Sequence, residues 1–533
     1  MKKRIIAVAL ATMMLASVLA GCKAAKTNET TETKGADTAN VSGETSEKEA
    51  PKEKKEITVM IMDRGQCATE EGTMEQNRWT EWINENSPVK VKWVPVPRSE
   101  SFSKVNTMFA SDSAPDLVWE FGKGFMDGLY TQGVIQPVDD YIEQYSTTYK
   151  AYLEEHPELR PYITEDDGKM YAFTSARTPL TIANHGMWIR QDWLDKLGLE
   201  TPTTVEELYD VAEKFAKNDP DGNGVDDTVG ISFNFNFFAI MKALYGLPGE
   251  NIVIENEKLS LWDGSEGYAQ CFEMIKKMYA NGVIDKEYVT DTNYERQRQL
   301  ITTGKAGIYF ARYDESGIWM DLKKNCPEAN LVPLESVEGP FGKFGLYQEP
   351  APFRTVCMNS KAKDPEAVIQ FLDWMLEEGW FTLTYGIEGE NYKLVDGVPQ
   401  AIDTDKNQKE LAYAYEYPTL MNQKIDNIDS YLTVTAASDE LSQEYAKLKA
   451  ESLNLAVKNK HRRDLPYTPS VESYIKYKSD FDTSSIEAKM VLDPSYSVEQ
   501  GVKDLIAERN SAGYEEAVKA LQDWYDANKD LLK

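Results

Sequence analysis

Oxygen-bearing side chains recur at alternate positions in the stretch DPDGNGVDD at 219–227. They match positions 1, 3, 5 and 9 of a calcium-binding loop, with a backbone carbonyl offered at position 7. In chain order the five ligands would be Asp219, Asp221, Asn223, Val225 and Asp227. Position 12 is Gly230 instead of glutamate, so the bidentate ligand must come from elsewhere or from water. The alternative is a plain turn, which Asp-Gly and Asn-Gly favour by themselves. The spacing favours a structural Ca²⁺ that holds a loop and takes no part in chemistry.

Residue types that commonly carry catalysis are sparse or uninformative. The chain has only the histidines His156, His185 and His461, and it lacks His-Glu-x-x-His and Cys-x-x-Cys motifs. It also lacks a nucleophile elbow and a phosphate-binding P-loop. The 88 acidic residues make carboxylate pairs too common to single out the two that a glycosidase needs. No catalytic residue and no enzyme activity are therefore predicted.

Composition narrows the class of partner. The formal net charge of −30 and the pI of about 4.7 leave no basic stripe for phosphates. We therefore expect neither a nucleic acid nor an anionic lipid surface as ligand. The 11 Trp, 29 Tyr and 18 Phe suit sugars, whose apolar faces stack on rings, although aromatic residues also fill ordinary cores. The scattered cysteines are expected to be free thiols, although an exported protein could pair them; they are Cys67, Cys271, Cys326 and Cys357.

The N-terminus is typical of a secretory signal. A basic start at 1–4 precedes an apolar run at 5–20, which is too short and wrongly flanked for a spanning helix. The run closes on Leu-Ala-Gly-Cys22, which resembles a bacterial lipobox. That resemblance implies lipidation of Cys22, with the mature protein outside the cytoplasm and held at the bacterial cell membrane by two acyl chains. The alternative is an ordinary signal in which Cys22 stands by chance.

Hydrophobic patterns predict the elements that would position these residues. Residues 23–56 lack aromatic side chains and are predicted to form a flexible linker after the signal peptide at 1–22. The body at 57–533 exceeds the ~250–300 residues of a single core, so at least two lobes are expected. Strands predicted at 57–62, 89–94 and 182–189 alternate with helices at 73–85, 101–110, 204–217 and 514–532. This alternation indicates an α/β protein.

Several ordered pieces of the sequence resemble the extracellular solute-binding protein family 1, the receptors of carbohydrate ABC importers, and in particular its large lipoprotein branch. They are SAPDLV at 113–118, GVIQPVDDY at 133–141, GMWIRQDWLDKLGL at 186–199, TPTT at 201–204, DPDGNG at 219–224, GKAGI at 304–308 and YGIEG at 385–389. The resemblance implies a type II periplasmic-binding-protein fold, in which two α/β lobes joined by a hinge close around a ligand. Lobe 1 would hold about 57–178 and 355–430, and lobe 2 about 179–354 and 431–533.

Polar and aromatic residues near strand ends are the candidates for the cleft between such lobes. Asp63 and Arg64 follow the first predicted strand, although they could be a surface pair. In the run at 233–237, alternation predicts two Asn on one face and three Phe on a core face. Trp119 could belong to the core instead of the cleft. The predicted ligand-binding set is Asp63, Arg64, Trp119, Glu120, Arg177, Asn234, Asn236, Arg312 and Tyr313.

These observations lead to one preferred function and two alternatives. The preferred function is an extracellular, lipid-anchored binding component that captures a sugar or oligosaccharide for the permease subunits of an ABC importer. We expect it to be a monomer. A receptor for peptides or amino acids is the first alternative, and an anchored glycoside hydrolase is the second.

Overall fold

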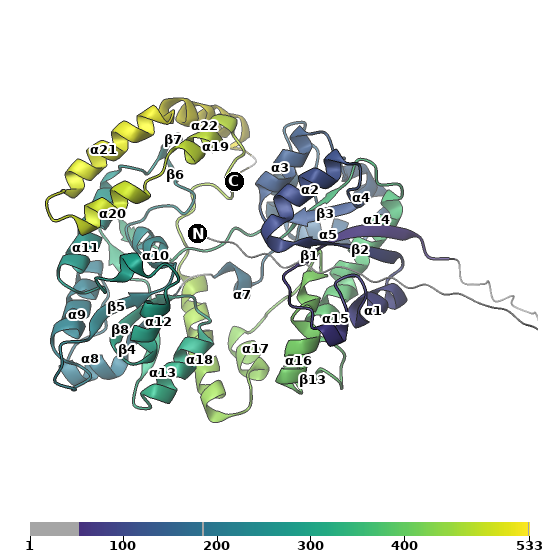
Figure 1. Cartoon of the computed structure of the whole chain (residues 1–533). Helices are drawn as coiled ribbons and strands as arrows, with labels where there is room; N and C mark the ends of the chain where they lie inside the picture. Colours follow the sequence, from purple (N-terminus) through teal and green to yellow (C-terminus); the bar gives the residue numbers. More distant parts are fainter. Residues whose placement is uncertain (1–52, 184–185, 531, 533) are drawn as a thin grey trace, which may run out of the picture. The chain divides into compact units, whose positions relative to one another are not determined.

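The computed structural model of the chain describes residues 53–183, 186–530 and 532 (Figure 1). The helices and strands described here all belong to one compact unit, residues 54–533. Cys22 and most of the predicted linker lie outside the described residues. Within the described part, no helix is both long enough and apolar enough to cross a bilayer.

The first sheet has the strand order β12-β3-β1-β2. Its strands are β1 (Glu56–Asp63), β2 (Lys90–Pro97), β3 (Leu117–Glu120) and β12 (Thr355–Met358). β2 and β3 pair in parallel with β1, whereas β12 pairs antiparallel with β3, with Thr355 opposite Glu120. A strand from much later in the chain therefore completes this sheet.

Helices from two stretches of the chain accompany this sheet. The earlier stretch supplies α1 (Arg78–Asn86), α2 (Ser101–Ala110), α3 (Lys123–Thr131), α4 (Asp139–Tyr145), α5 (Thr148–Glu155) and α6 (Arg160–Ile163). The later stretch supplies α14 (Pro365–Trp374), α15 (Trp380–Tyr385), the hairpin of β13 (Tyr392–Val395) and β14 (Val398–Ala401), α16 (Thr404–Leu411) and α17 (Ile428–Thr435). A π-helical turn, Met375–Gly379, joins α14 to α15.

The second sheet has the order β5-β8-β4-β9. Its strands are β4 (Gly186–Arg190), β5 (Val229–Phe233), β8 (Ala306–Ala311) and β9 (Leu331–Leu334). β4 pairs antiparallel with β8 and β9, and β5 pairs in parallel with β8. The helices of this stretch are α7 (Pro179–Ile182), α8 (Gln191–Leu197), α9 (Val205–Lys217), α10 (Phe237–Leu244), α11 (Glu266–Ala280), α12 (Glu295–Thr302) and α13 (Ser316–Asn325).

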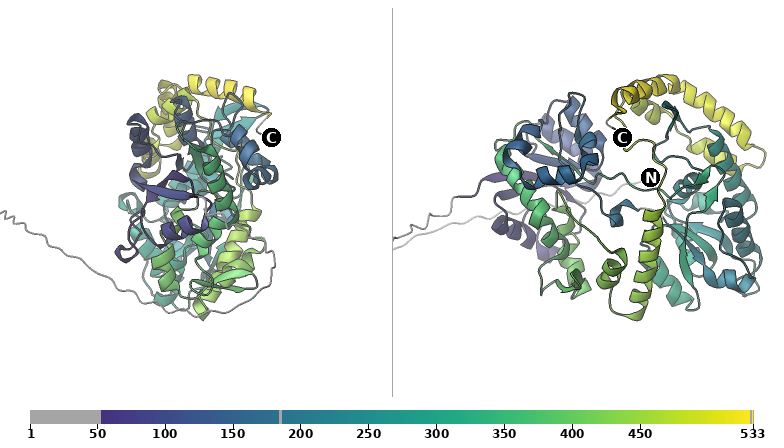
Figure 2. Two further views of the ribbon diagram at one scale, coloured as in Figure 1. Left: turned by 90° about the vertical axis from the view of Figure 1, so that its right-hand side faces the viewer. Right: turned by 180° about the vertical axis from the view of Figure 1, so that it is seen from behind.

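Two short hairpins and the C-terminal helices complete the body. The hairpins are β6 (Ile252–Glu255) with β7 (Lys258–Leu261) and β10 (Glu338–Gly339) with β11 (Gly342–Lys343). The helices, coloured light green to yellow in Figures 1 and 2, are α18 (Glu440–Lys458), α19 (Glu472–Asp480), α20 (Ser484–Leu492), α21 (Val498–Ser511) and α22 (Tyr514–Asn528). α20 and α21 pack on α11, and α22 packs on α19 and β7.

The buried side chains form separate cores around the two sheets. The first core joins residues between Ile57 and Phe173 to residues between Phe353 and Met421, and it includes Tyr467. The second core joins residues between Met187 and Leu346 to residues between Ile486 and Leu505. The described cysteines Cys67, Cys271, Cys326 and Cys357 are all unpaired, as expected.

Most predicted elements are confirmed, with three corrections. The helix predicted at 73–85 is α1, and it begins only at Arg78, because the Asn77 side chain caps it there. Residues 101–110 form α2 as predicted, and the predicted helix at 204–217 is α9, where the Thr204 side chain caps the helix by accepting from the Glu207 amide. The strand predicted at 182–189 begins only at Gly186, because Pro179 starts the short helix α7 before it. The strand predicted through 237 ends at Phe233, because the chain turns there and enters α10.

Candidate functional site

A cavity of about 420 Å³ lies beside α10, within the size range of small-ligand sites. We call it the aromatic cavity. Its lining residues come from the β5–α10 turn, α10, the loops flanking the β6–β7 hairpin and two later segments; they are Phe235, Asn236, Ala239, Lys242, Leu247, Pro248, Gly249, Trp262, Tyr347 and His461.

Three rings supply flat apolar surface to this cavity. The Phe235 side chain is 63 % exposed, which is unusual for a phenylalanine. Trp262 is partly buried, and its Nε1 donates to the carbonyl of Pro248 at 2.8 Å, which fixes the ring. Tyr347 packs edge-on against His461 with 5.3 Å between ring centroids. Fixed aromatic surfaces of this kind bind apolar faces of ligands at a low cost in conformational entropy.

Two polar atoms in the lining have no hydrogen-bond partner among the described residues. They are Nδ2 of Asn236, a residue only 1 % exposed, and Nε2 of His461. Buried polar groups are normally paired, because an unpaired one loses its hydrogen bonds to water without replacement. These two atoms are therefore positions where a ligand oxygen or hydroxyl would be stabilised.

The protonation state of His461 follows from its surroundings. Burial, reinforced by the positive charge of Arg463, lowers the pKa of His461 to about 4. The ring is therefore neutral at physiological pH and carries one proton. Its Nδ1 lies 3.4 Å from the carbonyl oxygen of Gly345, which can only accept, so the proton belongs on Nδ1. Nε2 is left as an acceptor, while Nδ2 of Asn236 is a donor.

Lys242 brings a positive charge to the same wall, and Glu487 compensates it. The Lys242 Nζ lies 3.4 Å from a carboxylate oxygen of Glu487 and 4.9 Å from the centre of the Trp262 ring. The hydroxyl of Tyr268 donates to the same carboxylate at 2.6 Å. The ion pair is largely shielded from water, since the two side chains are 21 % and 16 % exposed.

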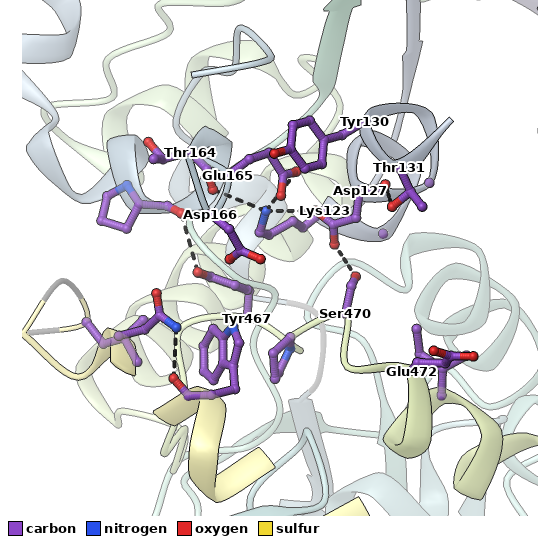
Figure 3. A pocket seen from close by; sticks show the side chains of 18 residues that line it. Lys123, Asp127, Tyr130, Thr131, Thr164, Glu165, Asp166, Tyr467, Ser470 and Glu472 are labelled. Carbon is purple, nitrogen blue, oxygen red and sulfur yellow. Dashed lines mark hydrogen bonds and ion pairs between the residues drawn. The ribbon is translucent and has the colours of Figure 1, made fainter. Parts of the chain in front are cut away.

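A second cavity, of about 560 Å³, lies between α3 and α22 and is shown in Figure 3. We call it the Lys123 cavity. Its lining includes Lys123, Asp127, Tyr130, Glu165, Tyr467, Ser470 and Trp524. The aromatic cavity and the Lys123 cavity flank one chain segment, residues 461–470, which contributes His461 to the former and Tyr467 and Ser470 to the latter.

Lys123 is paired with two of the carboxylates that line the Lys123 cavity (Figure 3). The Lys123 Nζ lies 2.7 Å from Asp127 and 3.4 Å from Glu165. The hydroxyl of Ser470 donates to the other oxygen of Asp127. Burial raises the pKa of Glu165 above its usual range, although Lys123 opposes the shift.

The predicted ligand residues near the first sheet lie apart from the aromatic cavity. Asp63 accepts from the amide of Gly65, and Arg64 pairs with Glu416 at 2.6 Å. Glu120 is 1 % exposed and accepts from Arg98 and Ser101.

Trp119 lies in the core, which is one of the two positions that the sequence leaves open for it. The ring is fully buried, and its Nε1 donates to the carbonyl of Met60 at 2.9 Å. The guanidinium of Arg354 lies 4.1 Å from the ring centroid, which covers one face of the indole. No part of this ring is available to a ligand in the structure.

Of the predicted ligand residues near the second sheet, one lines the aromatic cavity and the others are held by contacts elsewhere. Asn236 lines the aromatic cavity, and neighbouring Asn234 donates to Glu315 at 3.1 Å. Arg312 pairs with Asp314 at 3.0 Å, and Tyr313 is 3 % exposed with its hydroxyl donating to the carbonyl of Leu180.

Arg177 lines a smaller cavity of about 160 Å³, together with Tyr415 and Tyr431. Its Nε donates to the carbonyls of Pro350 and Pro352, and its guanidinium lies 3.9 Å from the carboxylate of Glu349. The side chain is therefore held in place by backbone and carboxylate oxygens.

The face assigned to the phenylalanines at 233–237 needs correction at one position. Phe233 and Phe237 are buried and stack at 4.3 Å between centroids, as predicted for a core face. Phe235 is exposed instead, because the strand ends at Phe233 and strict alternation stops there. The ring consequently belongs to the cavity wall.

The predicted calcium loop connects α9 to β5. Asp219 accepts the amides of Gly222, Asn223 and Gly224, which curls the loop around its carboxylate. The side-chain Nδ2 of Asn223 donates to both Asp221 and Asp227, so three of the predicted ligand side chains lie together.

A lysine already occupies part of this loop. The Lys305 Nζ binds Asp221 at 3.3 Å and Asp227 at 2.5 Å, which lowers the pKa of Asp227 and raises that of Lys305. As placed, the described residues contain no group of three His, Cys, Asp or Glu arranged to hold a metal ion. The chemistry of the donor set suits Ca²⁺, whereas the positions of its carboxylates suit the ammonium group.

The sequence analysis missed Trp262, Tyr347 and His461. Trp262 follows β7 in the stretch LSLWDG, where a tryptophan before a turn is also compatible with a core position. His461 and Tyr347 come from irregular segments far apart in the chain, and no local pattern links them to α10. Only the folded chain brings these rings together.

Sequence comparisons place the chain among binding proteins. The family model described as bacterial extracellular solute-binding protein matches residues 70–380. The polygalacturonan/rhamnogalacturonan-binding protein YtcQ of Bacillus subtilis (strain 168) is 26 % identical over 404 residues, covering 71 % of this chain and 72 % of YtcQ. Lipoprotein LipO of the same organism is 25 % identical over 458 residues, covering 83 % and 87 %. The fructooligosaccharide ABC transporter substrate-binding protein FusA of Streptococcus pneumoniae serotype 4 (strain ATCC BAA-334 / TIGR4) is 31 % identical over 256 residues, covering 44 % and 46 %.

The fold is also found in solved structures. An EF-hand mutant of S. pneumoniae FusA in complex with fructo-nystose has a TM-score of 0.64 at 19 % identity, covering 89 % of this chain and 100 % of that one. The likeness assigns the body to the two-lobe α/β fold of periplasmic binding proteins, in agreement with the sequence-based prediction.

Proposed function

Because the chain belongs to the bacterial extracellular solute-binding protein family, we propose that it is the substrate-binding component of an ABC importer and that it holds a sugar or oligosaccharide in the aromatic cavity. The observation that carries this proposal is the combination of Phe235 and Trp262 with the unpartnered Asn236 Nδ2 and His461 Nε2 in one lining. Rings suit the apolar faces of a pyranose or furanose, and a donor beside an acceptor suits its hydroxyls.

Two alternative ligands or activities are weighed against this one. A peptide ligand would bring a charged amine and a carboxylate, for which Asn236 and neutral His461 are poor counterparts. A glycoside hydrolase would need two carboxyls ~5–5.5 Å apart on either side of the bond to be cleaved. YtcQ and FusA are named as a binding protein and a transporter component, which supports capture without turnover.

The experiment that tests the proposal is calorimetric titration with a panel of oligosaccharides, followed by chromatography of the ligand. We expect binding of at least one sugar and its recovery unchanged. Phe235→Ala should weaken that binding by ~1–2 kcal/mol at little cost in stability, because the ring is already exposed. Phe102→Ala on α2, which removes another exposed ring (49 %), is the matched control and should leave affinity unchanged. Cleavage of the glycan, or tight binding of peptides and of no sugar, would overturn the proposal.

The proposed lobes follow the two cores. Lobe 1 would comprise about 57–178 and 355–430, and lobe 2 about 179–354 and 431–533, with the connections between them acting as a hinge. The separate hydrophobic clusters around the two sheets support this division. Tyr467, which is part of the first core, is an exception within the stretch assigned to lobe 2.

Anchoring at the cell membrane through a lipid on Cys22 is part of the same proposal. Its support is the lipobox-like ending of the apolar run at 5–20 and the similarity to a protein named as a lipoprotein. Cys22→Ser should release the protein from the membrane fraction or stop its maturation. Unchanged retention of the variant in membranes would contradict the anchor.

A structural Ca²⁺ in the 219–227 loop completes the proposal. The side chains that would hold it are Asp219, Asp221, Asn223 and Asp227, with the carbonyl of Val225. The solved structure of an EF-hand mutant of FusA supports looking for calcium in this chain. When bound, the ion would neutralise the clustered carboxylates and hold the α9–β5 loop, and it would compete with the ammonium group of Lys305.

A further inference from the structure

Lys242 in the lining of the aromatic cavity and Arg463 beside it are each compensated by a carboxylate of the chain itself. Lys242 in the lining is paired with Glu487, which also accepts a hydrogen bond from Tyr268. Because these side chains are mostly shielded from water, the charge of Lys242 is largely cancelled at short range before any ligand arrives.

The next cation along the wall is neutralised in the same way. Arg463 follows His461 by two residues, and its guanidinium binds the carboxylate of Glu250 and the carbonyl of Gln348. Glu250 is held in turn by the hydroxyl of Thr468 at 2.5 Å. His461 itself is neutral, since its pKa is lowered to about 4.

The neighbouring Lys123 cavity is net acidic. Lys123 is bound by Asp127 and Glu165, and Asp166 and Glu472 also belong to the lining. A long ligand leaving the aromatic cavity along residues 461–470 would therefore meet carboxylates. Over the whole chain, the formal net charge of −30 adds repulsion at long range.

From this arrangement we infer that the ligand is an uncharged oligosaccharide and that sugar acids such as galacturonate are rejected. The inference rests on the proposed function and narrows it. A bound carboxylate loses its hydration and needs an uncompensated cation or several donors in return. The lining offers the Asn236 donor and the His461 acceptor, a combination that matches a hydroxyl and repels a carboxylate at Nε2. The two named sugar-binding relatives do not decide the question, because one is named for polygalacturonan and the other for fructooligosaccharides.

The test compares neutral and acidic oligosaccharides of equal length by calorimetry at low salt. The probes are kestose and nystose, neutral galacto-oligosaccharides, and tri- and tetragalacturonate. We expect a neutral sugar to bind at least ~100-fold more tightly than either galacturonate, because like charges brought together across a site are strongly unfavourable. Tighter binding of a galacturonate than of every neutral sugar would overturn the inference and leave the proposed function intact. Binding of no sugar of either class would overturn both.

A charge-release variant tests the mechanism of rejection. Glu487→Gln keeps an acceptor for Tyr268 and frees the charge of Lys242, so galacturonate affinity should rise by about tenfold while neutral-sugar affinity changes little. Glu143→Gln on α4, the same chemical change in an exposed ion pair with Lys150 of α5, is the matched control and should change neither affinity. Equal galacturonate affinity in wild type and Glu487→Gln would contradict a role for this pair in rejecting acids.

Discussion

A single imidazole shows how burial fits a side chain to its ligand. His461 is surrounded by the edge of Tyr347, the carbonyl of Gly345, the ion pair of Arg463 with Glu250, and Asp464. A protonated ring would have to give up its hydration next to a guanidinium, and this cost lowers its pKa. As a result, Nε2 remains a hydrogen-bond acceptor across the whole physiological pH range.

The low pKa of His461 predicts how stability depends on pH. Its folded value of about 4 lies below the ordinary 6.5, so the unfolded chain binds more protons between these values. The contribution of His461 to the free energy of unfolding is therefore highest above pH 6.5. As the pH falls toward 4, this contribution decreases by an amount on the order of 3 kcal/mol. Urea unfolding of wild type and His461→Asn across this range would measure it.

The variant should lose less stability than wild type as the solution is acidified. His156→Asn, a change at a partly exposed histidine beside Glu158, is the control and should follow the wild-type curve. Parallel curves for wild type and His461→Asn would show that His461 is not buried in the neutral form. Sugar affinity should also stay constant from pH 7.5 to 5.5 if Nε2 is the acceptor.

At the scale of elements, ion pairs hold the loop between α9 and β5 against the neighbouring strand of the sheet. Its acidic side chains face Lys305, which precedes β8, so the ion pair links the start of β5 to the neighbouring strand. The left-handed backbone at Gly222 and Gly224 permits the tight curl. The loop can therefore be closed by a lysine or by a metal ion.

Calcium and Lys305 should compete for this loop. Added Ca²⁺ should raise the melting temperature and chelator should lower it, since a ligand of the folded state stabilises that state. Lys305→Met should tighten Ca²⁺ binding measured by titration, because it removes a competing cation. Lys361→Met, which breaks an exposed pair with Asp112, should leave it unchanged. An unchanged melt in chelator, with no metal in elemental analysis, would favour a plain turn.

An element can be predicted from the sequence when the residues that determine it lie close together in the chain. α9 could be read from the sequence because its cap, its periodic apolar face and its end all lie within 204–217. The exposed ring of Phe235 could not, because the strand stops at Phe233 and the alternation expected through 237 ends with it. The aromatic cavity depends on contacts across more than 200 residues of chain, from Phe235 to His461, which no periodic pattern encodes.

At the scale of the molecule, the two largest hydrophobic cores share one chain that passes between them repeatedly. The first sheet takes β12 from beyond the whole second sheet, and the helices α20 and α21 return to cover α11. Several covalent connections therefore join the proposed lobes, which favours a hinge over independent domains.

Ligand-driven closure is the expected behaviour of this arrangement. A sugar that binds in calorimetry should reduce the radius of gyration in solution scattering, because closure excludes water between the lobes. At 100 times the dissociation constant it should also add ~2.7 kcal/mol to the free energy of unfolding. A sugar that fails to bind in calorimetry is the control. An unchanged radius at saturation would argue against closure.

The position of β12 also fixes an order of folding events as the chain is made from its N-terminus. Thr355 must pair with Glu120 before the first sheet has its fourth strand, and everything between them in the chain must already have been synthesised. Contacts so distant in sequence form slowly, since a long loop must close first. The N-terminal portion should therefore remain incompletely folded while the segment containing the second sheet emerges. Despite leading the chain, the first sheet is then the later of the two to be completed.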